Sequence, residues 1–478
     1  MVFVAVAAAT ALVYAGWVAW VPLLPHNLDT PALDLGKITG YTWPSAAGYL
    51  AIVLTLFGLY ALGYGVVAAS RQPVRTWWLF ATAALFGAEL LLVYPATAAD
   101  VFGYIAAGQL LAAHHVNPLV VPPVAFSHDR IVAYLVYPGE PSQYGPLWVA
   151  LSGAIASLTR ADLLQGVLAY KLVGVAAHLA NGAVIYQIAA RLTGGATRAR
   201  VSAYLFLWNP LLLWEMVGNA HNDGLMLLFG LIGIWLFVSG RDLLALACVS
   251  LGALIKLPIA LIGPVMFVGV LRRNWVRAIE AALIGLALAV VVYRPFWAGP
   301  QTLSPLQRTD LFTASLGAVL RLAVLPVFGF DQANSVARTV SLTAFSVVAV
   351  GSVVLAFDAE TDTERLRPGY WTLLGALLLL TTWFQAWYVV WPLGVGTALG
   401  ERTRHVEVAL LSLGGLLQYF VFIYLWDLVF PHTETLGLQL TAYLALVGPL
   451  LVLVGWRVAR RVGLPMPRGI SASSAEYH

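Results

Sequence analysis

Apolar runs of about 20 residues recur along this chain from its first residues almost to its last. A helix of about 20 apolar residues is long enough to cross the roughly 30 Å hydrocarbon core of a membrane. Only 10% of the 478 residues are charged, whereas soluble domains carry about 25%. The sequence therefore predicts an all-α, polytopic transmembrane bundle without a separate soluble domain. The single cysteine, Cys248, lies in an apolar run, which excludes a disulfide framework.

Arginines are concentrated in short clusters between the apolar runs. This distribution follows the positive-inside rule, and it argues against a nucleic-acid surface despite the net charge of +4. Placing every cluster in the cytoplasm puts both termini on the inner face of the plasma membrane. The clusters are Arg71/Arg75, Arg191/Arg198/Arg200, Arg272/Arg273/Arg277, Arg365/Arg367, Arg402/Arg404 and Arg457/Arg460/Arg461/Arg468.

With this topology the sequence predicts about fourteen helices. The segment 145–158 would move the later arginine clusters outside if it crossed the membrane, so it is expected to be a juxtamembrane or re-entrant helix on the outer face. The short helices that meet at Lys256 indicate a water-filled cavity open to the outside. The predicted spans are 2–24, 46–69, 77–94, 163–190, 201–217, 224–240, 243–255, 257–271, 275–293, 336–357, 370–384, 388–399, 406–425 and 436–456.

One domain with five regions follows from this order. The regions are N-terminal helices (1–95), an outer catalytic loop with juxtamembrane helices (96–162), core helices (163–293), a second outer loop (294–335) and C-terminal helices (336–468). The inner loops are short and rich in arginine. Chemistry is therefore expected on the outer face.

Asp100 is the most informative single residue. It follows an apolar run at a helix mouth, where an ionisable side chain is a functional candidate. Tyr104 lies four residues later and shares its helix face if a helix begins at the carboxylate. A helix N-cap is the simpler explanation from spacing alone, although one residue can serve both purposes.

Two further segments carry polar and aromatic side chains on the same outer face. In segment 142–148, Gly145-Pro146 starts a helix between Tyr144 and Trp148, and these rings suit either an interfacial belt or a sugar-stacking surface. The second segment begins at Asn209-Pro210 and continues through Glu215 to His221-Asn222-Asp223. A polar hairpin with Asp223 as its N-cap explains that segment equally well.

Together, Asp100 with Tyr104, Asn117-Pro118, segment 142–148 and segment 209–223 resemble the GT-C superfamily of membrane glycosyltransferases. The similarity is greatest to bacterial polyprenyl-phosphate-mannose-dependent alpha-(1->6)-mannosyltransferases, and it covers about the middle third of the chain. The C-terminal helices resemble those of the superfamily only in their high content of apolar residues. The chain departs from the simplest members of the superfamily by placing two extra helices before its first large outer loop.

The resemblance implies an inverting transfer of a sugar from a polyprenyl phosphate to a glycan or glycolipid acceptor, with Asp100 as general base. Mannose is favoured, while glucose, arabinose and galactose remain open. No cofactor is expected, and the expected partners are these substrates and membrane lipids, with the protein a monomer and no nucleic acid bound. The implied substrate-binding residues are Tyr104, Asn117, Tyr144, Trp148, His221, Asn222 and Asp223.

A leaving phosphate requires cationic partners. The candidates are Arg294, Lys256 and Lys171, with Arg308, Arg321 and Arg338 as further outer cations. Snorkelling explains Arg294 without a ligand, and a structural pair with Glu89 explains Lys171. The histidines show no firm metal-ligand spacing, so no metal is expected.

Two alternative functions remain. A secondary transporter would show internal repeats and broken helices with charges near the midplane, and no convincing repeat is present. A lipid-linked glycan ligase or polymerase would have arginine-rich outer loops and would lack the Asp100 arrangement.

Overall fold

A computed structural model describes all residues except 24–25, 70–72, 308–310, 431 and 462–478. Helices account for the regular structure, and the described residues contain no strand beyond two isolated bridges. The all-α prediction is thus confirmed. The helices are α1 (Val2–Trp20), α2 (His26–Asp29), α3 (Leu35–Thr39), α4 (Trp43–Ala69), α5 (Thr76–Leu90), α6 (Asp100–Ala112), η1 (Pro123–Phe126), η2 (Arg130–Tyr134), α7 (Pro146–Thr159), α8 (Leu163–Thr193), α9 (Ala196–Leu207), α10 (Pro210–Leu213), η3 (Trp214–Gly218), α11 (Asp223–Val238), α12 (Asp242–Ala253), η4 (Leu257–Ile262), α13 (Gly263–Arg273), α14 (Trp275–Tyr293), η5 (Arg294–Phe296), η6 (Pro300–Gln307), α15 (Leu316–Phe328), α16 (Phe330–Asp358), α17 (Asp362–Gly375), η7 (Ala376–Leu380), η8 (Ala386–Val389), α18 (Val390–Ala398), α19 (Arg402–Tyr419), η9 (Phe420–Leu425), α20 (Trp426–Leu428) and α21 (Leu436–Arg461).

Seven helical segments of the described chain are long and apolar enough to cross a membrane. Each coincides with one of the predicted spans, and large apolar side chains such as Leu283 and Leu286 of α14 remain exposed on them, as lipid contact allows. The other predicted spans fall on shorter or bent helices, so the count of about fourteen stays a prediction. The seven segments are Val2–Trp20, Trp43–Ala69, Leu163–Thr193, Trp275–Phe296, Phe330–Asp358, Arg402–Leu428 and Leu436–Ala459.

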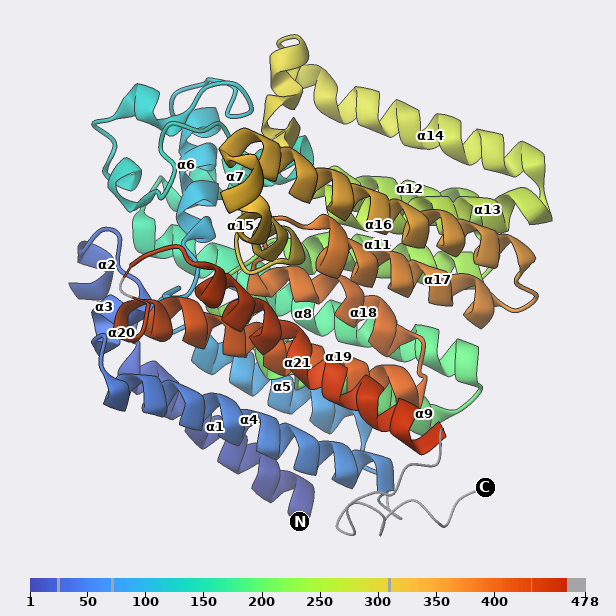
Figure 1. The fold of residues 1–478 in the computed structure, drawn as a ribbon. Helices are drawn as coiled ribbons and strands as arrows, with labels where there is room; N and C mark the ends of the chain where they lie inside the picture. The colour runs from blue at the N-terminus through green and yellow to red at the C-terminus, as the bar shows by residue number, and fades with distance from the viewer. Residues whose placement is uncertain (24–25, 70–72, 308–310, 431, 462–478) are drawn as a thin grey trace.

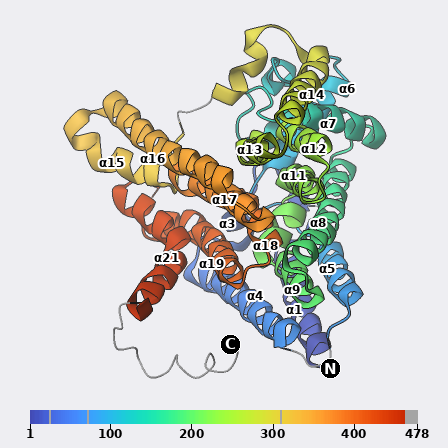
Figure 2. The same cartoon turned by 90° about the vertical axis from the view of Figure 1, so that its right-hand side faces the viewer.

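The long helices lie side by side, and short elements gather at one end of the bundle. Figure 1 shows α2, α3 and α6 at this end, whereas the start of α1 and the last turns of α21 lie at the opposite end. The view in Figure 2 shows α15 and part of α16 extending away from α11 to α14. The two ends of the bundle therefore differ in character, with irregular segments concentrated at only one of them.

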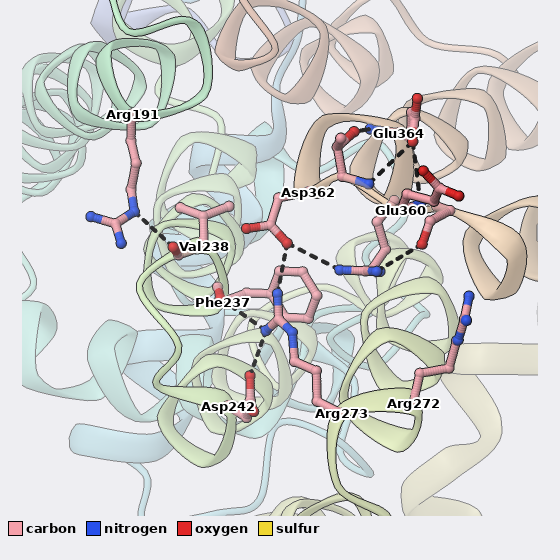
Figure 3. Close-up of polar contacts among 12 residues, drawn as sticks. Arg191, Phe237, Val238, Asp242, Arg272, Arg273, Glu360, Asp362 and Glu364 are labelled. Carbon is pink, nitrogen blue, oxygen red and sulfur yellow. Dashed lines mark hydrogen bonds and ion pairs between the residues drawn. The ribbon is translucent and has the colours of Figure 1, made fainter.

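The opposite end carries arginines that connect the ends of several helices. Arg273 of α13 bonds Asp242 of α12 at 2.9 Å and Asp362 of α17 at 2.6 Å (Figure 3). Arg191 of α8 donates to the carbonyl oxygen of Val238 at 2.7 Å. These contacts bring arginines from distant clusters of the sequence to one end of the bundle. Further pairs join Arg367 and Arg404 to Glu401 and Arg457 to Glu407.

The predicted juxtamembrane or re-entrant segment 145–158 corresponds to α7. Pro146 occupies its first turn directly after Gly145, a position that suits proline because no helical N–H partner is lost. The helix has 14 residues and packs against α6. The close packing of α6 against α7 depends on Gly108, where a Cβ would lie 2.4 Å from the carbonyl oxygen of Ser152. With 14 residues, α7 is shorter than a comfortable span.

Candidate active site

Asp100 is the first residue of α6, and the N-cap position belongs to Ala99. The explanation of Asp100 as a helix cap is therefore wrong. Its Oδ1 instead accepts a hydrogen bond from the hydroxyl of Tyr144 at 2.6 Å. The N-terminus of a helix stabilises a nearby negative charge, and 27% of the Asp100 side chain remains exposed. The carboxylate is thus held at one oxygen and accessible from a cavity.

An aromatic cluster supports this hydrogen bond. The ring of Tyr104, one turn after Asp100, lies edge-to-face 4.9 Å from Tyr144 and 5.0 Å from Trp148. Its hydroxyl oxygen accepts the backbone N–H of Asn222 at 3.4 Å. Burial, reinforced by the charge of Asp100, raises the pKa of the Tyr144 hydroxyl well above its ordinary value. Tyr144 therefore remains a hydrogen-bond donor to the carboxylate at neutral pH.

The start of α7 meets the end of α12 through the two backbones. The N–H of Gly145 donates to the carbonyl oxygen of Ile255 at 2.9 Å. A Cβ at Gly145 would lie 2.0 Å from the carbonyl oxygen of Leu254, so only glycine permits this approach. The contact brings Tyr144 beside Lys256, whose ammonium lies 5.7 Å from the centre of the tyrosine ring.

Lys256 also forms an ion pair with Asp223, the first residue of α11. The Lys256 ammonium lies 2.7 Å from Oδ2 of Asp223, and Oδ1 accepts the indole N–H of Trp391 at 2.6 Å. The Asp223 side chain is fully buried, while 13% of the Lys256 side chain is exposed. The ring of Tyr388 lies 5.2 Å from the same ammonium. The lysine is therefore anchored by one carboxylate and still presents part of its charge to a cavity.

His221 lies between Asp100 and a second buried carboxylate, Glu215. Its Nδ1 is 3.8 Å from Oδ2 of Asp100, and its Nε2 is 3.3 Å from Oε2 of Glu215. The side chains of His221 and Glu215 are fully buried. The imidazole stacks on Trp387, with the ring centres 4.1 Å apart and the planes 20° from parallel. Trp387 therefore fixes the plane of the imidazole.

Asp100 lines two neighbouring cavities. The larger, of about 350 Å³, extends toward the loop that carries Ser142 and includes Thr97, Gln143, Tyr144 and Gln385 among its walls. The smaller, of about 180 Å³, adds Lys256 and Tyr388 to walls that it otherwise shares with the larger cavity. It is lined by Asp100, Gln143, Tyr144, Lys256, Trp383, Trp387 and Tyr388. The two cavities thus adjoin at Asp100, and of the two only the smaller is lined by a lysine.

Lys171 is placed away from both cavities. Its side chain is fully buried, and its ammonium donates to the carbonyl oxygens of Leu90, Val217 and Gly218. Within the described residues it forms no ion pair with Glu89, the partner suggested by the sequence. The bonds explain how a lysine is tolerated inside a helix without a phosphate ligand.

Seven other predicted site residues do not line either cavity. Tyr104, His221, Asn222 and Asp223 are buried in the contacts described above. Asn117 donates to the carbonyl oxygen of Phe296 at 2.6 Å and accepts from the N–H of Leu119 at 3.0 Å, which fixes its loop. Trp148 packs inside the aromatic cluster, and Arg294 lies in η5. Of the further outer arginines, Arg321 pairs with Glu434 and Arg338 lies over the ring of Phe312, whereas Arg308 is outside the described residues.

The structure adds site residues that the sequence reasoning did not select. Glu215 was included only as part of the polar segment 209–223, and the aromatic segment 383–388 was not among the predicted site residues. Trp383, Trp387 and Tyr388 instead line the smaller cavity. Their signal was the density of aromatic residues at a predicted helix junction. Among the described residues, no three His, Cys, Asp or Glu side chains gather closely enough to hold a metal.

The fold and site define a helical membrane protein with a half-buried carboxylate between two cavities at one end of its bundle. The family model described as alpha-(1->6)-mannopyranosyltransferase, N-terminal domain, matches residues 2–274, more than half of the chain. The chain therefore belongs to this family. The matched region contains Asp100, Tyr144, Glu215, His221 and Lys256, but not the aromatic segment 383–388.

Individual relatives are distant. The chain is 23% identical over 369 residues to alpha-(1->6)-mannopyranosyltransferase A of Mycobacterium tuberculosis, covering 72% of this chain and 69% of the relative. It is 29% identical over 159 residues to alpha-(1->6)-mannopyranosyltransferase B of Corynebacterium glutamicum. That match covers 32% of this chain and only 26% of the relative. The similarity to the latter protein is thus confined to about a quarter of its length.

Proposed function

We propose that this protein is an inverting glycosyltransferase that moves a mannosyl group from a polyprenyl phosphate to a glycan or glycolipid acceptor. The observation that carries the proposal is the position of Asp100, whose carboxylate lines both cavities. A base for sugar transfer must reach the acceptor hydroxyl while that hydroxyl faces the donor carbon. Membership of the mannopyranosyltransferase family favours mannose as the transferred sugar.

The donor is assigned to the smaller cavity. Lys256 supplies positive charge for the departing phosphate, and the rings of Trp383, Trp387 and Tyr388 offer faces for a sugar. The acceptor is assigned to the larger cavity, which has Thr97, Gln143 and Gln385 among its polar walls. Asp100 is one of the residues that the two cavities share and the only carboxylate among them, so an acceptor hydroxyl beside it would also be near a donor in the smaller cavity.

In the proposed reaction, the acceptor oxygen bonds to the anomeric carbon as the bond from that carbon to the phosphate oxygen breaks. The electron pair leaves with the polyprenyl phosphate, and the hydroxyl proton moves to Asp100. Phosphate is a good leaving group, so no general acid is required. A direct displacement inverts the anomeric centre.

The site is assigned to the outer face of the plasma membrane. Helix α11 runs from Asp223 at the site to Val238 beside the arginines of the opposite end (Figure 3). Its 16 residues separate the two by about 24 Å at 1.5 Å per residue. The positive-inside rule places the arginine end in the cytoplasm, and with it the start of α1.

The test is a transfer assay with purified protein, a panel of polyprenyl-phosphate sugars and short mannose oligosaccharides as acceptors. The expected result is transfer from the mannose donor, with an α-linked product from a β-linked donor. Folded protein that transfers no sugar from any donor contradicts the proposal.

A further inference from the structure

The turn that presents His221 is conformationally strained. Ala220 has a φ of 60°, in the left-handed region that residues with a side chain rarely adopt, and it is 2% exposed. Such a conformation costs about 1–3 kcal/mol and persists only where the surroundings enforce it. The N–H of His221 donates to the carbonyl oxygen of Glu215 at 3.0 Å, which closes the turn. The strain is thus located where the imidazole is directed at Asp100.

The polar atoms around His221 are unusually short of hydrogen bonds. Neither ring nitrogen of His221, nor Oε1 of Glu215, nor either side-chain polar atom of Asn222 has a well-formed hydrogen bond among the described residues. Oε2 of Glu215 accepts from Asn219 at 2.9 Å. Buried polar groups are normally satisfied, because leaving one unpaired costs free energy. Several such groups beside one carboxylate indicate a function beyond stability.

We infer that His221, held by Glu215, accepts the proton that Asp100 removes from the acceptor. This inference rests on the proposed transfer reaction. Tyr144 occupies Oδ1 of Asp100, so the free Oδ2 takes the hydroxyl proton and then passes it to Nδ1 of His221, 3.8 Å away. His221 becomes an imidazolium facing the Glu215 carboxylate. After the product leaves, the proton returns through Oδ2 of Asp100 to water in the cavity, which restores both groups for the next turnover.

The direction of this transfer follows from the position of Glu215. A carboxylate beside the imidazole stabilises the imidazolium that the transfer produces. The contact of Nε2 with Oε2 of Glu215, at 3.3 Å, favours the tautomer that carries its proton on Nε2. That tautomer leaves Nδ1 as the acceptor facing Asp100. A small rotation of the Asp100 side chain closes the remaining gap, as is common for catalytic contacts before substrate binds.

The groups that face this relay come from several elements. Asp100 of α6 and Glu215 of η3 are the charged groups nearest the imidazole. Asp223 is already paired with Lys256, which limits the net effect of both on His221. Tyrosine hydroxyls also face these carboxylates, those of Tyr104, Tyr144 and Tyr388 near Asp100 and those of Tyr49 and Tyr419 near Glu215.

The experiment compares kcat and KM from about pH 5 to 9 for the full-length protein with polyprenyl-phosphate mannose and a mannose oligosaccharide. In Glu215→Gln the kcat at pH 7 is expected to fall about tenfold or more, with KM changed less than about twofold, since the proton acceptor loses its carboxylate partner and substrate contacts remain.

Two further variants separate charge from shape. Glu215→Asp keeps the charge and is expected to recover most of the wild-type kcat, although its side chain is shorter. Glu89→Gln removes a buried, unpartnered carboxylate oxygen that lies outside both cavities, and it is expected to leave the profile unchanged. A Glu215→Gln profile that matches that of Glu89→Gln overturns the inference.

His221→Asn tests the inference even if Glu215→Gln does not fold. A folded His221→Asn variant whose kcat stays within about twofold of wild type rules out His221 as proton acceptor. Absence of transfer by the folded wild type contradicts the proposed function itself, so the two failures are distinguishable.

Discussion

The hydroxyl of Tyr144 donates a 2.6 Å hydrogen bond to Oδ1 of Asp100 and thereby connects the loop before α7 to the first turn of α6. Because the two residues are 44 positions apart in the chain, the bond depends on the packing of α6 against α7. Gly108 permits that packing at one point of the interface. The packing of α6 against α7 therefore determines how the proposed base, Asp100, is oriented.

Replacing Asp100 by Asn should abolish transfer while leaving the protein folded. The amide keeps the size of the side chain but cannot accept the hydroxyl proton, and general bases contribute about 10²–10⁴-fold to rate. A radiolabelled transfer assay should show a loss of kcat in this range, with donor-lipid binding within about threefold of wild type. Asp129→Asn is a matched control, because this carboxylate pairs with His114 outside both cavities. Full turnover in Asp100→Asn excludes a base at this position.

Replacing Tyr144 by Phe should lower kcat about 10- to 100-fold. The change removes a hydrogen bond to a charged group, worth about 1.5–3 kcal/mol, and leaves the ring to pack against Tyr104. Asp100 then loses its fixed orientation but remains a carboxylate. Initial rates at saturating substrate, together with the thermal unfolding midpoint, distinguish this effect from unfolding. A variant that unfolds at a lower temperature yet turns over normally would show that the hydrogen bond serves stability alone.

The fold class was predictable because span length and charge asymmetry are read directly along the chain. The site was predictable only in part. Asp100 and His221 were visible as polar residues at helix ends, but the pair of Asp223 with Lys256 joins positions 33 residues apart. Such a pair requires knowledge of how α11 packs against α12. Glu215 could have been selected, since an ionisable side chain at the end of an apolar run is costly without a use.

Lys171 illustrates a different limit. The sequence suggested Glu89 as its partner because a buried lysine needs an acceptor. In the structure the acceptors include the carbonyl oxygens of Val217 and Gly218, at the end of η3. A helix end leaves carbonyl groups without intrahelical partners. The sequence alone does not predict where η3 ends or that its last carbonyl groups lie close to Lys171.

Replacing Lys256 by Met should impair both stability and donor use, and a second change should separate the two. Loss of the ammonium leaves the buried Asp223 carboxylate without its cation, which costs about 3–5 kcal/mol. Adding Asp223→Asn removes that charge and should recover most of the thermal stability. The double variant should still show kcat/KM for the donor about a hundredfold below wild type, because the phosphate lacks its cation.

The control for Lys256 is Lys37→Met. Lys37 pairs with Asp34 at the surface, with side chains 49% and 43% exposed, so its loss should alter stability by less than about 1 kcal/mol. Recovery of donor use in the double variant would show that Lys256 serves only to neutralise Asp223.

Replacing Gly145 by Ala should destabilise the protein and reduce transfer together. The added Cβ would lie 2.0 Å from the carbonyl oxygen of Leu254, so the backbones of α7 and α12 must separate. Overpacking of this kind costs about 1–3 kcal/mol, and the separation also moves Tyr144 away from Lys256. Gly139→Ala is the matched control in the same loop, because nothing lies within 4 Å of a Cβ there. Thermal unfolding and kcat should both fall for Gly145→Ala and remain near wild type for Gly139→Ala. Equal behaviour of the two variants would mean that the close approach of α7 to α12 is unnecessary for the site.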